Sequence, residues 1–166
     1  DDSGDDTGDF DVTNSKVGQY RYVYVDNDVN ISTFAKKKVY LRAKGVYSGS
    51  GTNSGSVVCL LWVDDDCYTE SGSCSGKEIN AAVAENLADT FAAHYYHERS
   101  VFGEESDKYY VYNVTTGSPS LAKMTSSNSD TATYVNIVVY DIGADYTLDA
   151  KSQCGVVGYF YSKDYV

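Results

Sequence analysis

Apolar residues occupy almost every position of two stretches of the chain, Val57–Val63 and Tyr134–Tyr140. A strand with both faces buried has this pattern, whereas a strand with one face in water alternates apolar and polar residues. Both stretches are therefore predicted to be central strands of a sheet.

A long helix is predicted between these strands, from about Lys77 to about Arg99. Its apolar residues recur at every fourth position, which keeps them on one stripe: Ile79, Val83, Leu87, Phe91 and Tyr95. Small residues flank that stripe and would allow close approach to a sheet: Ala82, Ala84, Ala88 and Ala92. Ser73 or Ser75 is the expected N-cap, and Gly103 is expected to end the helix.

Further strands are predicted from alternating patterns. The first places Tyr20, Tyr22 and Tyr24 on one face and is expected to turn at Asp26–Asp28. The others are Lys38–Tyr47, a short edge strand at Lys108–Val114 and a final edge strand at Gly155–Tyr161. Thr115–Thr131, which is rich in Ser, Thr and Asn, is predicted to be a loop.

A strand, a crossover helix and a second apolar strand predict a βαβ unit whose two strands are central and parallel. The predicted fold class is therefore α+β with an α/β-like core: a mixed, strand-rich, twisted sheet backed by one long helix. Residues 10–166 are expected to form a single domain, since 166 residues suit one core.

The net charge is −11 and the chain has 17 Tyr. A duplex-binding surface needs clustered Lys and Arg, and the only basic cluster is Lys36–Lys38, so nucleic acid is not an expected partner. Tyrosine favours strands with one wet face, because the ring packs while the hydroxyl stays solvated. Exposed rows of tyrosine are therefore expected.

Residues 1–9 are a low-complexity acidic leader that cannot bury enough apolar surface to order itself. The leader resembles the tether that remains after an export or lipoprotein signal is removed; the alternative is a disordered chain end. An extracellular, surface or periplasmic location is therefore expected. Since no apolar run approaches the roughly 20 residues of a membrane span, membrane contact is expected only through an N-terminal lipid anchor.

Four cysteines are present, and Cys67 and Cys74 flank a short loop that a disulfide can close. This bridge is predicted, and it implies an oxidising compartment. Cys59 and Cys154 lie in apolar, strand-like runs and are either buried thiols or a second bridge.

Carboxylates follow both predicted central strands. Asp64, Asp65 and Asp66 end the first, while Asp141 and Asp145 follow the second, so adjacent parallel strands would bring them to one edge. Oxygen ligands of this kind suit Ca²⁺, and the alternative is solvated loop acids. His94 and His97 share a helix face but lack a third ligand and the His-Glu-x-x-His order, so they are interpreted as a polar helix end.

Three pieces of the chain, in order, are similar to the region upstream of the catalytic motif in hyicolysin-like neutral zinc metallopeptidases. They are Leu61–Asp65, Ala84–Phe91 running into Ser100–Glu105, and Val135–Ile142 followed by Gly155–Phe160. The resemblance covers about Lys38 to Val166 and implies the N-terminal half of a zincin. The family's His-Glu-x-x-His helix would come after Val166, so no catalytic residue is carried over, and Zn is implied only if that half exists.

Two functions follow as expectations. The first is the non-catalytic N-terminal part of an exported, zinc-metallopeptidase-like protein, which leaves enzyme activity undecided. The second is a surface binding or assembly module that contacts protein or glycan through a sheet edge and tyrosine-rich faces, with self-association included. The zincin analogy implies that the edge strand adds a peptide by β-augmentation. That strand would present Gly155, Val156, Val157, Gly158 and Tyr159.

Overall fold

The computed structural model describes residues 10–28, 31–49, 55–70, 79–103, 108–113, 118–125 and 132–140. Its elements are β1 (Phe10–Asp11), β2 (Tyr20–Asp28), β3 (Ile31–Ser48), β4 (Ser56–Asp64), the short 3-10 helix η2 (Asp65–Cys67), α1 (Ala81–Phe102), β5 (Lys108–Asn113), β6 (Ser118–Thr125) and β7 (Thr133–Val139). Among the described residues, no helix combines the length and the hydropathy that crossing a membrane requires.

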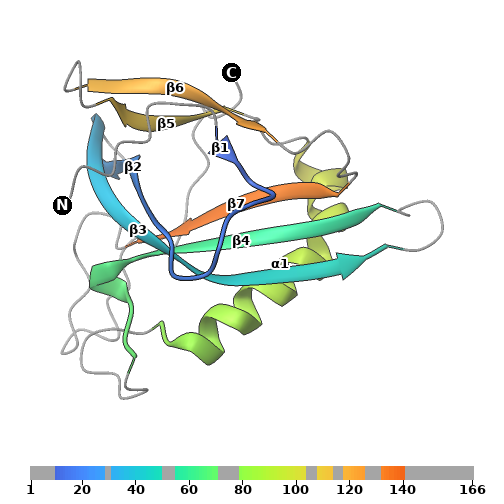
Figure 1. The fold of residues 1–166 in the computed structure, drawn as a ribbon. Helices are drawn as coiled ribbons and strands as arrows, with labels where there is room; N and C mark the ends of the chain where they lie inside the picture. Colours follow the sequence, from blue (N-terminus) through green and yellow to red (C-terminus); the bar gives the residue numbers. More distant parts are fainter. Residues whose placement is uncertain are drawn as a thin grey trace.

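The strands form one mixed sheet in the order β1-β6-β5-β2-β3-β4-β7. β2, β3 and β4 pair antiparallel over long registers, whereas β4 and β7 run parallel from Val57↔Thr133 to Val63↔Val139. β5 joins β2 through the single pair Val23↔Val111. Beyond that junction the sheet curls, so that β5 and β6 lie on the side of β4 and β7 opposite α1 (Figure 1). The predicted α+β class is confirmed, and β4 and β7 are parallel neighbours as predicted. β4 is central, but β7 is the last strand in the described order and only Val135 in it is buried, so the prediction that both strands are central is wrong for β7.

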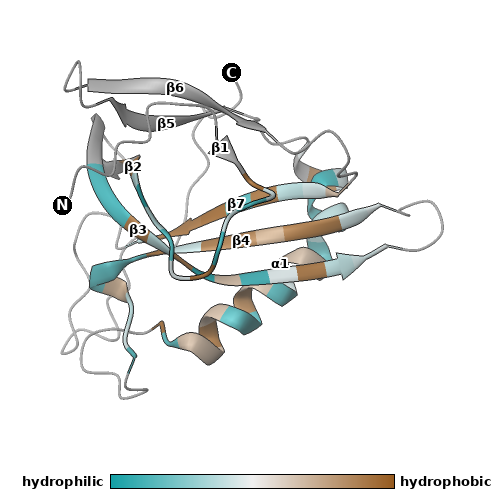
Figure 2. Cartoon of the chain, in the orientation of Figure 1, coloured by the Kyte–Doolittle hydropathy of each residue, from teal (hydrophilic) through white to brown (hydrophobic). Residues whose placement is uncertain are grey.

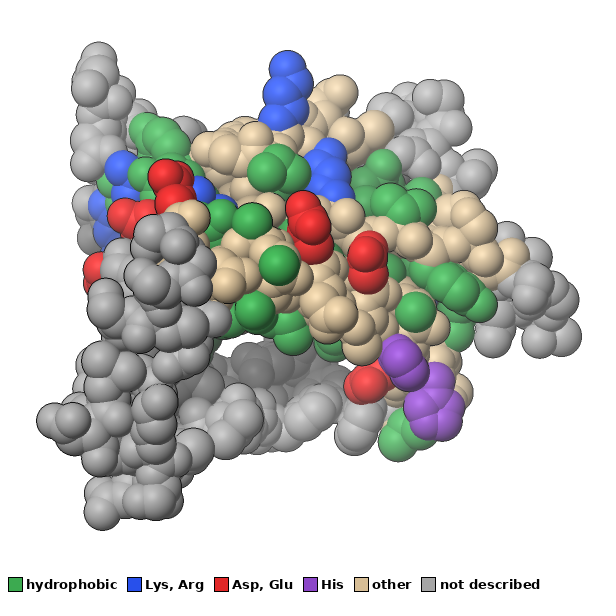
Figure 3. All heavy atoms as spheres, turned by 90° about the horizontal axis from the view of Figure 1, so that it is seen from below, with side chains coloured by type: hydrophobic (Ala, Val, Ile, Leu, Met, Phe, Trp, Pro, Cys, Tyr) green, Lys and Arg blue, Asp and Glu red, His purple; other side chains and the backbone are tan. Residues whose placement is uncertain are grey.

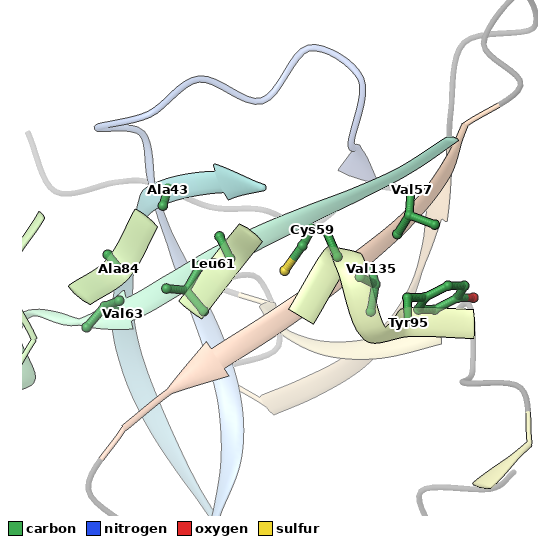
Figure 4. Close-up of a cluster of buried hydrophobic side chains, with 10 residues drawn as sticks. Ala43, Val57, Cys59, Leu61, Val63, Ala84, Tyr95 and Val135 are labelled. Atoms are coloured by element: carbon green, nitrogen blue, oxygen red, sulfur yellow. The ribbon is translucent and has the colours of Figure 1, made fainter. Parts of the chain in front are cut away.

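β4 lies between β3 and β7 and is buried on both faces, as its sequence predicts. Its odd-numbered residues from Val57 to Val63 belong to the core beneath α1 (Figure 4). Leu60 and Trp62 belong to a second core on the opposite face, together with Val12, Val39 and Leu41. Figure 2 shows hydrophobic residues along β4 and β7, with hydrophilic residues recurring along β3 and α1.

Only part of the predicted apolar stripe of α1 is buried against the sheet. Ala84, Ala88 and Ala92 are fully buried, whereas Val83 is 36% and Leu87 is 40% exposed. The helix turns its alanines inward because it rests on Gly45 of β3: a Cβ there would lie 2.1 Å from the Ala88 carbonyl oxygen. Such close backbone approach leaves no room for branched side chains, whose size sets the distance between packed elements.

The ends of α1 differ in how well they were predicted. The helix begins at Ala81, and Asn80 is its N-cap rather than Ser73 or Ser75, since the Asn80 side chain accepts a hydrogen bond from the Val83 N–H. Gly103 ends the helix as expected: its φ is 91°, which glycine adopts without strain, and its N–H donates to the Arg99 carbonyl.

Two predicted segments are wrong. The Lys108–Val114 strand is not an edge strand, because β5 lies between β6 and β2. Thr115–Thr131 is not all loop, because it contains β6 despite its proline. Pro119 pairs with Tyr112 of β5, and β1 on the other side reaches only Met124 and Thr125. Among the described strands, Pro119 therefore has a neighbour on one side only, and proline is tolerated where one side of a strand is unpaired.

The end of β2 also differs from the prediction. β2 continues through the predicted turn at Asp26–Asp28, with an irregularity between Asp26 and Asp28 in its pairing with β3. The predicted strand at Gly155–Tyr161 and the acidic leader lie outside the described residues.

Candidate functional site

The pairing of β2 with β3 places a row of tyrosines beside a row of cations. Tyr20 lies opposite Tyr40, Tyr22 opposite Lys38, and Tyr24 opposite Lys36. Alternate residues of a strand point to the same face, so the side chains of Tyr20, Tyr22, Lys36, Lys38 and Tyr40 share one side of the sheet. Tyr40 also pairs with Val63, which packs beneath α1, so this is the α1 side.

Two lysines lie over tyrosine rings on this face. The Lys36 ammonium is 4.1 Å from the centre of the Tyr22 ring. The Lys38 ammonium is 4.4 Å from the Tyr20 ring, and the rings of Tyr22 and Tyr40 are 5.9 and 5.8 Å away. A cation within about 6 Å of an aromatic centre is attracted by the ring quadrupole. The lysines are therefore held in position by the rings.

Arg42 extends the row toward η2. Its guanidinium lies 4.6 Å from the Tyr40 ring and 3.7 Å from the Tyr68 ring. Tyr68 is fixed because it forms a parallel β-bridge with Ile79. An irregularity between Leu41 and Ala43 lets β3 place Leu41 in the second core and Ala43 beneath α1.

We call this surface the tyrosine–cation face; its residues are Tyr20, Tyr22, Tyr40, Tyr68, Lys36, Lys38 and Arg42. Lys36 is exposed and the other members are half-buried. The Tyr20 ring meets the Tyr22 ring edge-on at 6.1 Å and the Tyr40 ring at 5.8 Å. Aromatic pairs at these separations stabilise each other, so the rings hold one another in a defined arrangement.

The middle lysine of the basic cluster points to the other side of the sheet. The Lys37 ammonium lies 2.9 Å from the Asp64 carboxylate, which is almost fully buried. The hydrogen bond to Asp64 raises the pKa of Lys37, against the opposing effect of burial. Within the basic cluster, Lys37 therefore forms a structural ion pair, whereas Lys36 and Lys38 belong to the tyrosine–cation face.

The carboxylates predicted to bind Ca²⁺ are only partly described. Asp64 pairs with Lys37, Asp65 lies 3.2 Å from Arg42, and Asp66 is exposed. Asp141 and Asp145 lie outside the described residues. The described part of the chain contains no group of three or more His, Cys, Asp or Glu able to hold a metal ion. The calcium site stays a prediction.

The two histidines lie near the C-terminal end of α1, and Figure 3 shows them at one end of the surface that surrounds the helix. Both are exposed. The Nδ1 atom of His94 is 2.8 Å from the Thr90 carbonyl oxygen, within the same helix. This contact fits the interpretation of these residues as a polar helix end.

The described cysteines are buried to different degrees. Cys59 is a fully buried thiol beneath α1, where desolvation first and the Asp89 charge second raise its pKa to about 12. Cys67 is half-buried and packs against the same core. Cys74 and Cys154 lie outside the described residues, so the Cys67–Cys74 bridge stays a prediction.

Cys59 is expected to resist alkylation in the native protein. The thiolate is the reactive form, and at pH 8 a thiol with a pKa of about 12 is ionised to about one part in ten thousand. Peptide mass mapping after iodoacetamide treatment should find Cys59 unmodified in buffer and modified in guanidinium chloride. Equal modification of Cys59 under both conditions would contradict its placement in the core.

Sequence reasoning found the parts of the tyrosine–cation face but not their combination. The sequence shows both the tyrosine row of β2 and the basic cluster, but not that the two lie on one face. The signal that could have joined them is the alternation of tyrosine in one strand and lysine in the next, because antiparallel neighbours share a face.

The resemblance to zinc metallopeptidases stays a prediction. Comparison of the chain with protein-family models, with curated proteins and with solved structures found no significant match.

Proposed function

We propose that this domain is a binding module that contacts a protein or glycan outside the cell through the tyrosine–cation face. The observation that carries the proposal is the set of ring–cation contacts, from 3.7 Å at Arg42 and Tyr68 to 5.9 Å at Lys38 and Tyr22. Tyrosine rings offer apolar faces and polar hydroxyls to a partner at a low cost in side-chain entropy.

The position of the face supports a role in contact with other molecules. β2 and β3 hold the tyrosine–cation face rigidly, because β3 pairs with β2 on one side and with β4 on the other. A site on paired strands keeps its geometry better than a site on a loop. The extracellular or cell-surface location remains part of the proposal.

The metallopeptidase-like alternative rests on the three sequence pieces that resemble that family. It requires a His-Glu-x-x-His helix in the reading frame downstream of Val166, which would supply two zinc ligands and the catalytic glutamate. Sequencing the gene beyond the codon for Val166 tests it. A reading frame that lacks this motif removes the alternative and leaves the binding module.

The binding proposal is tested with the double variant Tyr22→Ser/Tyr40→Ser. The probes are immobilised gelatin, dextran, dextran sulfate and alginate, and binding is measured by biolayer interferometry. At least one probe should bind the wild type. The double variant should bind about tenfold more weakly, because each aromatic contact contributes about 0.5–1.5 kcal/mol.

The matched control is Leu87→Ser, which removes a 40% exposed apolar side chain of α1 that does not belong to the face. Its affinity should stay within about twofold of the wild type, because exposed substitutions away from a site have small effects. Circular dichroism confirms that all variants are folded. Equal binding by the wild type and the tyrosine variant overturns the proposal, as does failure of the wild type to bind all four probes.

A further inference from the structure

We infer that Tyr20 and Tyr40 form a site of oxidative cross-linking, at which a one-electron oxidant joins the two rings by a carbon–carbon bond. The oxidant is of the haem peroxidase class and uses hydrogen peroxide. The reaction needs no bound partner, so it is independent of the proposed function. Strand pairing, ring arrangement and exposure all favour this pair over the other described tyrosine pairs.

Tyr20 and Tyr40 lie directly opposite each other, at the end of the β2–β3 register that is farther from the connection between the strands. The neighbouring Leu41 directs both of its backbone groups toward β2. Its N–H donates to the Gln19 carbonyl and its carbonyl accepts from the Gly18 N–H, both at 2.8 Å. Hydrogen-bonded and non-hydrogen-bonded pairs alternate along antiparallel strands, so Tyr20 and Tyr40 form a non-hydrogen-bonded pair, whose side chains approach more closely.

The two rings are arranged for contact between their edges. Their centroids are 5.8 Å apart and their planes are inclined by 52°. The carbons that couple lie beside the hydroxyl, at the edge of each ring, and two rings joined by a single bond are twisted relative to each other. The Lys38 ammonium lies 4.4 Å from the centre of the Tyr20 ring and 5.8 Å from that of Tyr40. Because a cation is attracted to the face of a ring, this contact orients the rings without using the carbons that couple.

The reaction removes one electron and one proton from each phenol. Each ring becomes a neutral phenoxyl radical, whose unpaired electron is shared between the oxygen and the carbons beside it. The two radicals pair to form the carbon–carbon bond, and each coupled carbon then passes its hydrogen through water to its own oxygen, which restores both phenols. Hydrogen peroxide takes up the two electrons and the two protons and becomes two molecules of water. The product therefore lacks two hydrogen atoms.

Two other ring pairs in the described part of the chain are less suited to coupling. The rings of Tyr95 and Tyr96 are closer, at 5.4 Å, but Tyr95 is only 3% exposed and its hydroxyl accepts a hydrogen bond from Arg99. The rings of Tyr20 and Tyr22 are 6.1 Å apart and inclined by 82°, so the edge of one ring faces the plane of the other. Tyr20 and Tyr40 are both half-buried, which leaves them accessible to an oxidant.

A bond between Tyr20 and Tyr40 fastens the open end of the β2–β3 hairpin. β2 depends on β3 for its place in the sheet, because its described pairing with β5 is limited to Val23↔Val111. The bond also closes a loop in the unfolded chain, which lowers the entropy gained on unfolding. The cross-linked protein should therefore have a midpoint of thermal unfolding several degrees above that of the untreated protein.

The experiment treats the purified chain with a haem peroxidase and hydrogen peroxide, isolates the monomer by gel filtration and digests it with trypsin. Tyr20 and Tyr40 are the single tyrosines of the tryptic peptides 17–21 and 39–42, so one joined mass identifies their cross-link. Tyr95 and Tyr96 share the peptide 78–99, and loss of two hydrogens from that peptide reports the competing pair. The joined mass should be the more abundant product, in a yield that does not depend on protein concentration.

Tyr40→Phe keeps the ring but removes the hydroxyl, so it forms no phenoxyl radical and the joined product should be lost. Tyr47→Phe is the matched control, because Tyr47 is a half-buried tyrosine of the same strand, and its yield should stay within about twofold of the wild type. Far-UV circular dichroism checks the fold of both variants. A wild-type monomer without the joined mass overturns the inference, as does a more abundant Tyr95–Tyr96 product or an equal loss in Tyr47→Phe.

Discussion

Replacing Gly45 with alanine should lower the midpoint of thermal unfolding by about 6–12 °C, which corresponds to a loss of about 3 kcal/mol in a chain of this size. The added Cβ would meet the Ala88 carbonyl oxygen at 2.1 Å and the Asp89 nitrogen at 2.6 Å. Both are backbone atoms of α1, so relief requires the whole helix to move away from β3. Differential scanning calorimetry measures the shift.

Val46→Ala is the matched control, because Val46 is the next residue on β3 and is 63% exposed. Its unfolding free energy should stay within about 0.5 kcal/mol of the wild type. The double variant Gly45→Ala/Ala88→Gly should be no more stable than Gly45→Ala, since the contact involves backbone and not the Ala88 side chain. A Gly45→Ala midpoint that matches the wild type would show that α1 does not rest on this residue.

Replacing Lys37 with methionine should lower the free energy of unfolding at neutral pH by about 2–3 kcal/mol. The variant leaves the Asp64 carboxylate, which is 4% exposed, without the ammonium that now lies 2.9 Å away. The expected loss is below that of a fully buried pair because the Lys37 side chain is 22% exposed. Urea denaturation measures the loss.

The double variant Lys37→Met/Asp64→Leu should recover much of the stability, because replacing both charges with apolar groups removes the unpaired carboxylate. The pH dependence has a defined sign. Since the pKa of Lys37 is raised above its usual 10.5, the pair stabilises the fold fully below that pH and loses its effect as the pH rises through the folded-state pKa. The stability difference between wild type and Lys37→Met should therefore shrink in strong alkali, and a constant difference would exclude the ion pair as its cause.

The strands of the sheet could be predicted from the sequence where burial alone determines which positions are apolar. Val57–Val63 is apolar at every position because two different cores lie on its two sides, and the sequence shows this directly. β2 and β3 were also predictable, since the alternation of tyrosine with other residues reflects one face in water and one face packed.

The face of α1 was not predictable from its own residues. The stripe that includes Val83 and Leu87 is more hydrophobic than the alanine row, yet the alanine row packs against the sheet. The deciding residue, Gly45, lies far away in sequence on β3. Periodicity identifies the faces of a helix, but the shape of the partner decides which one packs.

β6 was missed for a similar reason. Ser118–Thr125 is polar and contains a proline, so its composition favours a loop. It pairs because β5 offers a continuous register from Lys108↔Lys123 to Asn113↔Ser118. The tyrosine–cation face likewise depends on a pairing between two strands, and a pass along one strand at a time does not show which side chains meet.

β7 pairs with β4 only after residues 65–132 have been made, which sets an order of events during translation. At about 5–20 residues per second, roughly 3–14 s pass between synthesis of the two strands. Throughout that interval, the nascent chain presents the edge of its most apolar strand without the neighbour that will cover it. That edge is where a chaperone at the ribosome would protect the emerging polypeptide from aggregation.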